Sequence, residues 1–206
     1  MKDFFGLGEA RWRRSDGRLH CYIVPPAPVR ELAAQYQQVM RQHEIVSVQP
    51  PEWLHMTVQS IDRHRGEIDD GVVTELAEVL TARMTAIAPF PVTVGPAMVG
   101  VHVVSLFVPP PATALRKLMI TTRDAVAEVL GGDAVPPISP RWAPHISLAY
   151  GRAAGSSDPL IRAVKDAWLA PVTFSVDAMH LVLAEPRDGG YVWDTLQTLP
   201  LTGQAT

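Results

Sequence analysis

The chain has 206 residues, and its 18 Lys and Arg against 21 Asp and Glu give a formal net charge of −3. This length suits one large domain, and the slightly acidic charge gives no general attraction to polyanions, so a long nucleic-acid footprint is not favoured. The chain has a single Cys, which argues against an intramolecular disulfide and a Cys-based metal cluster. No apolar run reaches about 18 residues, which argues against a membrane span. The sequence also lacks a signal-peptide pattern, so we expect a cytoplasmic protein.

The first half of the chain is predicted to alternate strands with helices. Residues 1–18 form a basic N-terminal segment that we expect to be flexible. Runs of β-branched and aromatic residues bounded by Pro or Gly predict strands, whereas apolar residues recurring every three or four positions predict helices. In chain order we expect a strand over 19–24, a helix over 29–43, a strand at 55–58, a helix over 70–87 and a strand over 91–94.

The second half is predicted to repeat this order. The expected elements are a strand over 101–108, a helix over 112–130, a strand at 145–148, a helix over 159–169 and a strand over 172–176. Residues 178–184 and 191–199, joined by a Gly-rich turn, then predict an antiparallel hairpin that closes the second lobe. Matching landmarks in the two halves lie 80 to 90 residues apart. We therefore expect one domain, 1–206, built from two repeated lobes that share a core.

The same short motif occurs once in each half. His55-Met-Thr57-Val in the first half is matched by His145-Ile-Ser147-Leu in the second, and each follows a Pro-rich segment that contains a Trp. On a strand, residues i and i+2 share a face, so each motif presents one imidazole and one hydroxyl on the same side. Two such strands brought together would surround one cleft with two histidines and two hydroxyls.

With these paired H-x-[ST]-apolar motifs inside a repeat, the chain resembles the two-histidine (2H) phosphoesterase superfamily, which includes 2′-5′ RNA ligase-like proteins and cyclic nucleotide phosphodiesterases. The resemblance spans about residues 19–201. It implies an α+β fold of two pseudo-symmetric lobes, each with an antiparallel sheet and helices outside, around a central cleft. It further implies that His55 and His145 are catalytic and that Thr57 and Ser147 bind the phosphate.

The chemistry of such a cleft is acid–base catalysis on a phosphodiester. One neutral imidazole removes a proton from the attacking oxygen, and one protonated imidazole supplies a proton to the departing oxygen, which a side chain with a pKa near 6.5 can do near neutral pH. The hydroxyls would donate hydrogen bonds to the phosphate oxygens. This scheme needs no metal and no cofactor. The repeat leaves open which histidine is the acid.

The residues flanking the motifs have alternative interpretations. Trp53 and Trp142 either line the cleft and stack on a base or cover the edge of the sheet. Arg141 and Arg152 are candidate phosphate contacts, although flanking arginines are more often solvated loop residues. By strand alternation the side chain of Tyr150 should lie on the other face of the strand from His145, in the core. The remaining aromatic and histidine side chains are expected to pack in the core or to lie at the surface: Tyr191, Trp193, His20, His43, His64, His102 and His180.

Three classes of function remain open from the sequence: a phosphodiesterase or ligase, a non-catalytic binder, and a histidine metal site. The favoured class is a metal-independent phosphoesterase that acts on a 2′,3′-cyclic phosphate or a 2′-5′ phosphodiester of a nucleotide or RNA end. The alternatives are an ATP-independent 2′-5′ RNA ligase and a non-catalytic nucleotide-binding protein that uses the same cleft. A histidine metal site is disfavoured because neither motif carries an adjacent carboxylate. The expected partner is a small nucleotide or an RNA terminus, bound by a monomer without an obligate protein partner or a membrane.

Overall fold

The computed structural model describes residues 1–6, 17–140 and 142–204. The elements of the first half are β1 (Arg18–Ile23), α1 (Ala27–Met40), β2 (Val46–Val48), β3 (Met56–His64), α2 (Asp70–Met84) and β4 (Phe90–Val94). Those that follow are β5 (Ala97–Val99), β6 (Val103–Phe107), α3 (Thr113–Leu130), β7 (His145–Gly151), α4 (Asp158–Asp166), β8 (Val172–Val176), β9 (Ala178–Arg187) and β10 (Gly190–Pro200). The predicted α+β order is confirmed in both halves. Strands β2 and β5 were not predicted, because at three residues each they are too short to show a period.

The strands of the two lobes form one continuous antiparallel sheet. Its order is β10-β9-β1-β3-β7-β6-β5, and β2 pairs with β7; β4 and β8 form a separate two-stranded sheet. The lobes meet where β3 and β7 pair, and the register there joins Met56 to Ile146. Each of these residues follows the histidine of its motif, so the junction of the lobes is also the place where the motifs meet.

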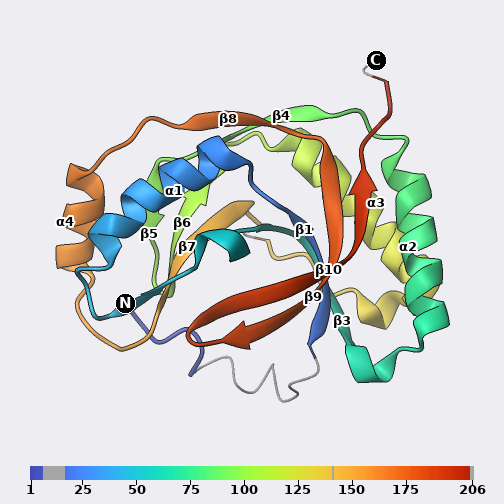
Figure 1. Ribbon diagram of the computed structural model, residues 1–206, viewed down its shortest axis with the longest axis horizontal. Coiled ribbons are helices and arrows are strands. Elements are labelled where there is room, and N and C mark those ends of the chain that lie inside the picture. The colour runs from blue at the N-terminus through green and yellow to red at the C-terminus, as the bar shows by residue number, and fades with distance from the viewer. Residues whose placement is uncertain (7–16, 141, 205–206) are drawn as a thin grey trace.

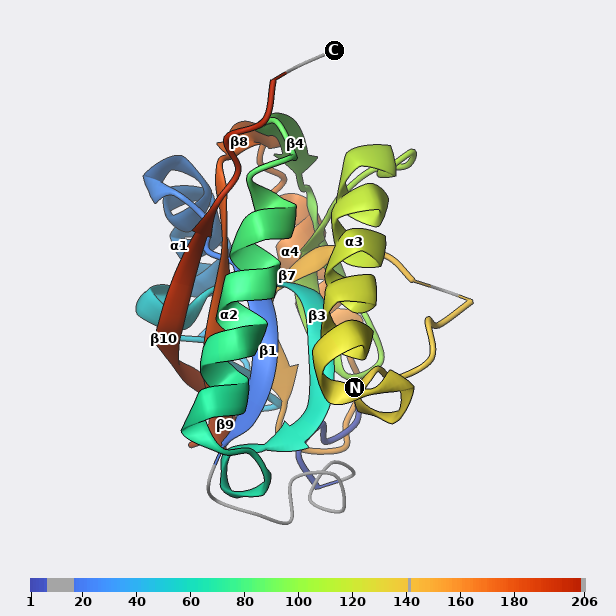
Figure 2. The same ribbon diagram turned by 90° about the vertical axis from the view of Figure 1, so that its right-hand side faces the viewer.

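The helices are exchanged between the lobes. Helix α1 comes from the first half, yet it packs on α4, β7 and β8 of the second, while α3 comes from the second half and packs on α2 and β3 of the first. Figure 1 shows α1 and α4 at one end of the molecule, and Figure 2 shows α2 and α3 side by side in front of β1 and β3. One hydrophobic core therefore includes buried residues from both halves, among them Tyr36, Ile61, Leu80, Leu118 and Leu148.

The C-terminal hairpin closes the first lobe, and the prediction that it closes the second is wrong. Strand β9 pairs with β1 along its length, from Arg18 opposite Ala184 to Tyr22 opposite His180, and β10 forms the outer edge. The free edge of β1 selects this position, because β3 already occupies its other side. The local sequence determines the turn of a hairpin and the pairing of its two strands. The strand that the hairpin joins depends instead on which strand edge elsewhere in the fold is unpaired.

Residues 1–6 run across the second lobe. The Lys2 N–H donates to the Val101 carbonyl and the Phe4 N–H donates to the Gly151 carbonyl, both at 2.8 Å. A Cβ on Gly151 would lie 2.1 Å from the Lys2 carbonyl oxygen, so this approach requires glycine. The basic cluster of the expected flexible segment lies largely outside the described residues: Arg11, Arg13 and Arg14. None of the described helices is both long and apolar enough to cross a membrane.

Candidate active site

The two motifs face each other across the junction of β3 and β7. Because the register pairs Met56 with Ile146, the flanking residues of this antiparallel pair place His55 across from Ser147 and Thr57 across from His145. All four side chains line one cavity of about 370 Å³. Each imidazole thus stands beside the hydroxyl of the other motif, and a phosphate in the cavity would be within reach of both pairs.

Backbone carbonyls hold both histidines in the same way. Nδ1 of His55 donates to the Trp53 carbonyl oxygen at 2.8 Å, and Nδ1 of His145 donates to the Ala143 carbonyl oxygen at 2.9 Å. In both cases the acceptor lies two residues before the histidine. Since a carbonyl can only accept, Nδ1 carries the proton, and Nε2 is the nitrogen that can take or give a proton.

The surroundings of the two histidines differ. His55 is 7% exposed and stacks on the Tyr22 ring, with centroids 4.0 Å apart and an interplanar angle of 14°. Burial lowers its pKa to about 4, because the charged form is poorly solvated; the Trp53 hydrogen bond opposes this shift and the nearby His145 adds to it. His145 is partly exposed and lies beside the Phe107 ring. At neutral pH His55 is therefore neutral and suited to act as a base.

A buried glutamine fixes the carbonyl that orients His55. Gln49 is fully buried, and its Nε2 donates to the Trp53 carbonyl at 2.9 Å and to the Tyr191 carbonyl at 2.6 Å. Its Oε1 accepts from the Tyr191 N–H at 2.9 Å, and Trp193 Nε1 adds a third donor to the Trp53 carbonyl at 3.2 Å. Gln49 thus ties the segment before the first motif to β10, which forms part of the cavity wall.

Tyr150 points into the cavity, contrary to the prediction that it lies on the opposite face. The register of β6 and β7 pairs Ser105 with Ser147 and Val104 with Ala149, so Leu148 is an extra residue on β7. Such a bulge reverses the alternation of side chains beyond it and returns Tyr150 to the face of His145. Burial raises the Tyr150 pKa well above its usual value, and a hydrogen bond with Ser147 opposes this shift.

The first motif carries the equivalent bulge. Tyr22 pairs with Thr57 and Cys21 with Gln59, so Val58 is the extra residue on β3. Val58 and Leu148 are the fourth residues of their motifs, which means that the repeat includes this irregularity. β-Bulges occur often beside active sites, where they redirect side chains. A period of two residues could not predict either bulge.

Besides Tyr22, Tyr150 and Val103, four residues of the cavity wall were not among the predicted site residues. They are Tyr191 on β10, His20 on β1, and His102 with Phe4, which precede β6 and β1 in the chain. His20 is buried, and its Nδ1 donates to the Arg18 carbonyl at 3.1 Å. The only sequence signal was that His20 and Tyr22 share one face of a strand. Their proximity to the motifs depends on the pairing of β1 with β3.

Burial of His20 should make the protein less stable in mild acid. Burial lowers its pKa from 6.5 to about 3, so below pH 6.5 the unfolded chain binds a proton that the folded chain excludes. The free energy of unfolding should therefore fall as the pH decreases from 6.5, by up to about 1.4 kcal/mol per pH unit for one such group. Urea unfolding at pH 7.5 and 5.5 would measure this loss. We expect the loss of stability between these pH values to be smaller in His20→Asn than in the wild type. An equal loss in both proteins would contradict the assignment of this effect to His20.

The other predicted site residues fall in different places. Trp53 does not line this cavity; it packs edge-on against Trp193 at 5.6 Å and covers part of the sheet. Trp142 lines a second, adjoining cavity together with His145. Arg152 is exposed, lines neither cavity, and bonds through its backbone N–H to the Ile45 carbonyl. Arg141 lies outside the described residues.

The side chains of the main cavity are mostly aromatic, hydroxyl-bearing or imidazole. None of those lining it in the described ranges is Lys, Arg, Asp or Glu. The described residues also contain no group of three or more His, Cys, Asp or Glu that could hold a metal ion. The arrangement can therefore bind an aromatic ring system next to a phosphate, and it can transfer protons through two imidazoles.

The sequence matches the model of a known protein family. The model of the 2′-5′ RNA ligase superfamily matches residues 19–187. The chain belongs to this superfamily. This membership confirms the resemblance to the 2H phosphoesterases and supports a phosphoesterase or RNA ligase-like enzymatic activity. A search of the curated proteins gives no match.

Solved structures of similar proteins share the fold. TT0787 of Thermus thermophilus superposes with a TM-score of 0.70 at 23% identity, over 91% of this chain and 100% of that one. E. coli LigT complexed with NADP+ superposes with a TM-score of 0.66 at 20% identity, over 92% of this chain and 99% of that one. E. coli LigT complexed with 3′-AMP gives 0.65 at 18% identity, over 90% and 98%.

Proposed function

We propose that the protein is a metal-independent phosphoesterase that acts on a 2′,3′-cyclic phosphate or a 2′-5′ phosphodiester of a nucleotide or RNA end. The observation that carries this proposal is the crossed arrangement of the motifs, with His55 across from Ser147 and Thr57 across from His145 around one cavity. Two proton-transfer groups and two hydroxyl donors around one phosphate are sufficient for the reaction.

The different surroundings of the histidines suggest their roles. His55, kept neutral by burial, takes the proton of the attacking oxygen at Nε2, while His145 gives a proton from Nε2 to the departing oxygen. One P–O bond forms while another breaks. In the transition state between them, additional negative charge develops on the non-bridging oxygens of the phosphate. Thr57 and Ser147 donate hydrogen bonds to these oxygens. Ligation to a 2′,3′-cyclic phosphate uses the same groups in the same roles, with a hydroxyl of a second RNA end in place of water as the attacking oxygen.

The aromatic wall supports a nucleoside as the organic part of the substrate. Tyr22, Tyr150, Tyr191 and Phe4 surround the imidazoles, and aromatic rings of this kind stack on bases of any sequence. The structure of E. coli LigT with 3′-AMP shows that a protein of this fold binds a nucleotide. The absence of cationic side chains from the described lining agrees with a small substrate that carries few phosphates.

The pH dependence of turnover tests the mechanism. Because the pKa of His55 is lowered to about 4, we expect kcat/KM for a 2′,3′-cyclic nucleotide to start decreasing only well below pH 6.5 as the solution is made more acidic. Loss of the proton from the acid should give a second, alkaline limb. Turnover should be the same with and without a chelator. A rate that only rises with pH and that a chelator abolishes would indicate a metal-bound hydroxide instead.

A further inference from the structure

Residues 1–6, which we call the strap, complete the wall of the main cavity. The superfamily model matches residues 19–187, so the strap lies before the matched part of the chain. The strap nonetheless places Phe4 in the lining of the cavity that contains the two motifs. Figure 1 shows the strap starting beside β7 and running toward the turn between β9 and β10. One wall residue therefore comes from a segment outside both repeated lobes.

Backbone hydrogen bonds fix the strap against the end of β7. The bonds from the Lys2 and Phe4 N–H groups, described above, are joined by one from the Gly155 N–H to the Met1 carbonyl at 3.1 Å. The Met1 side chain packs in the hydrophobic core. Gly151 lies directly beneath the Lys2 carbonyl, and a methyl group in its place would overlap that oxygen. The strap can occupy this position only because residue 151 has no side chain.

Two phenylalanine rings join the strap to the aromatic wall of the cavity. Phe4 packs on Tyr150 with ring centroids 4.9 Å apart, and Phe5 packs on Tyr150 at 5.3 Å and on Tyr191 at 5.4 Å. Tyr150 and Tyr191 are themselves in contact at 5.5 Å. Phe5 is not among the residues that line the cavity, whereas Phe4 is. Phe5 thus anchors the strap on β7 and β10, and Phe4 presents its ring to whatever the cavity holds.

We propose that Phe4 is a specificity-determining residue that contacts the base of the substrate, and that the strap holds it in place. This inference rests on the proposed function. An aromatic ring stacks on any base, so Phe4 selects substrates that carry a base over those that do not. The rings that Phe4 contacts are those of Phe5, Tyr150 and Tyr191, and neither motif imidazole is among its contacts in the described ranges. Its removal should therefore weaken binding and leave proton transfer intact.

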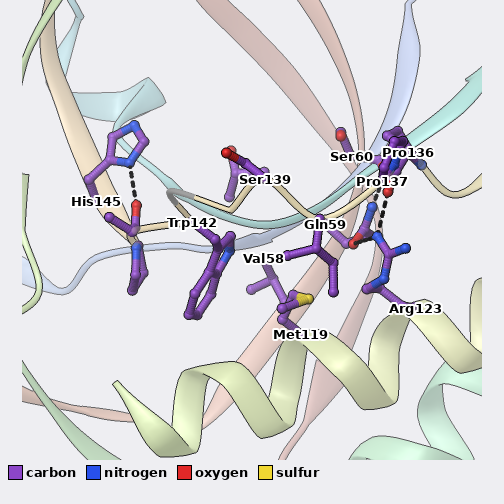
Figure 3. A pocket seen from close by; sticks show the side chains of 14 residues that line it. Val58, Gln59, Ser60, Met119, Arg123, Pro136, Pro137, Ser139, Trp142 and His145 are labelled. Atoms are coloured by element: carbon purple, nitrogen blue, oxygen red, sulfur yellow. Dashed lines mark hydrogen bonds between the residues drawn. The ribbon is translucent and has the colours of Figure 1, made fainter. Parts of the chain in front are cut away.

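The strap acts on the main cavity alone. Figure 3 shows the second cavity, which lies around His145, Trp142 and Arg123. No residue of the strap lines it. A change in the strap should therefore alter only the binding of the group that occupies the main cavity.

Two substrates test the contact: adenosine 2′,3′-cyclic phosphate and methyl β-D-ribofuranoside 2,3-cyclic phosphate, which has the same sugar and phosphate but no base. We expect Phe4→Ala to raise KM for the adenosine compound by roughly tenfold, as the loss of one stacking ring gives. Its kcat for that compound should stay within about twofold of the wild type, and so should both constants for the base-free compound.

Gly151→Ala displaces the strap without removing any of its side chains, so it should raise KM for the adenosine compound as Phe4→Ala does. The double variant should be little worse than either single one, because both changes remove the same contact. Phe5→Ala loosens the anchor and should give a smaller rise; it keeps the test available if Gly151→Ala does not fold. Trp168→Ala is the control, since Trp168 is exposed and lines neither cavity, and it should leave KM unchanged.

The possible results separate the strap from the proposed function. An unchanged KM for the adenosine compound in Phe4→Ala, or an equal rise for both compounds, would overturn the contact with the base. Additive effects of Phe4→Ala and Gly151→Ala would overturn the role of the strap. A wild-type protein that hydrolyses neither compound would overturn the proposed function. The affinity for 3′-AMP then tests Phe4: Phe4→Ala should weaken it by roughly tenfold, and an unchanged affinity would overturn the inference.

Discussion

Replacement of His55 or His145 by alanine is expected to lower kcat for a 2′,3′-cyclic nucleotide by roughly 10²-fold or more in each case. Each imidazole performs one proton transfer, and neither Thr57 nor Ser147 can replace it. Because the two transfers belong to one reaction step, the double variant should be little worse than either single one. Initial rates with saturating substrate, followed by separation of product from substrate, would measure the effect.

His43→Ala is the matched control, since His43 lines neither cavity. It should keep the wild-type rate, and all three variants should remain folded at the assay temperature. Near-normal turnover by either His55→Ala or His145→Ala would refute the two-histidine mechanism. It would leave the fold assignment intact, because the fold does not depend on these side chains.

A second large effect is expected at Gln49. Gln49→Met removes three hydrogen bonds that its side chain makes to the backbone of Trp53 and Tyr191. At about 1 kcal/mol each, their loss should lower the free energy of unfolding by about 3 kcal/mol, and more if a buried backbone group finds no new partner. The midpoint of urea unfolding should fall accordingly. Turnover should also fall under conditions where the variant is fully folded, because the Trp53 carbonyl that orients His55 loses one of its donors.

Gln35→Ala provides the comparison, because Gln35 is exposed and, among the described residues, its side chain makes only a long bond of 3.4 Å to the Glu31 carbonyl. We expect its free energy of unfolding to stay within about 0.5 kcal/mol of the wild type. If Gln49→Met were as stable as Gln35→Ala, the buried bonds of Gln49 would not contribute to the fold. Unchanged turnover in a folded Gln49→Met protein would show that His55 is oriented without it.

The repeat and its motifs were enough to predict the α+β fold, because periodicity and the recurrence of landmarks are local properties of the chain. His55, Thr57, His145 and Ser147 could be predicted as candidate site residues for the same reason: each pair has a spacing of two on a strand, and the four line one cavity. The side chains that complete the wall around them were not found. Tyr150 depends on a bulge at Leu148, which a regular alternation cannot predict.

Long-range pairing explains the remaining failures. His20 and Tyr191 reach the cavity because β1 pairs with β3 and because the hairpin pairs with β1. Nothing in the hairpin sequence indicates which edge it joins. Gln49 illustrates the same limit: a glutamine after a short strand has no sequence feature that distinguishes it, yet it connects segments 142 residues apart.

The exchange of α1 and α3 between the lobes has a consequence for synthesis on the ribosome. The strands of the first lobe are not fully covered until α3 has emerged, and the edge of β1 stays open until β9 is made. The second lobe likewise waits for β6 and β7, although its helix α1 is among the first parts translated. A nascent chain halted between the two repeats would therefore expose apolar surface on both strands and helices. Ordered structure should appear late, when nearly the whole polypeptide has left the exit tunnel.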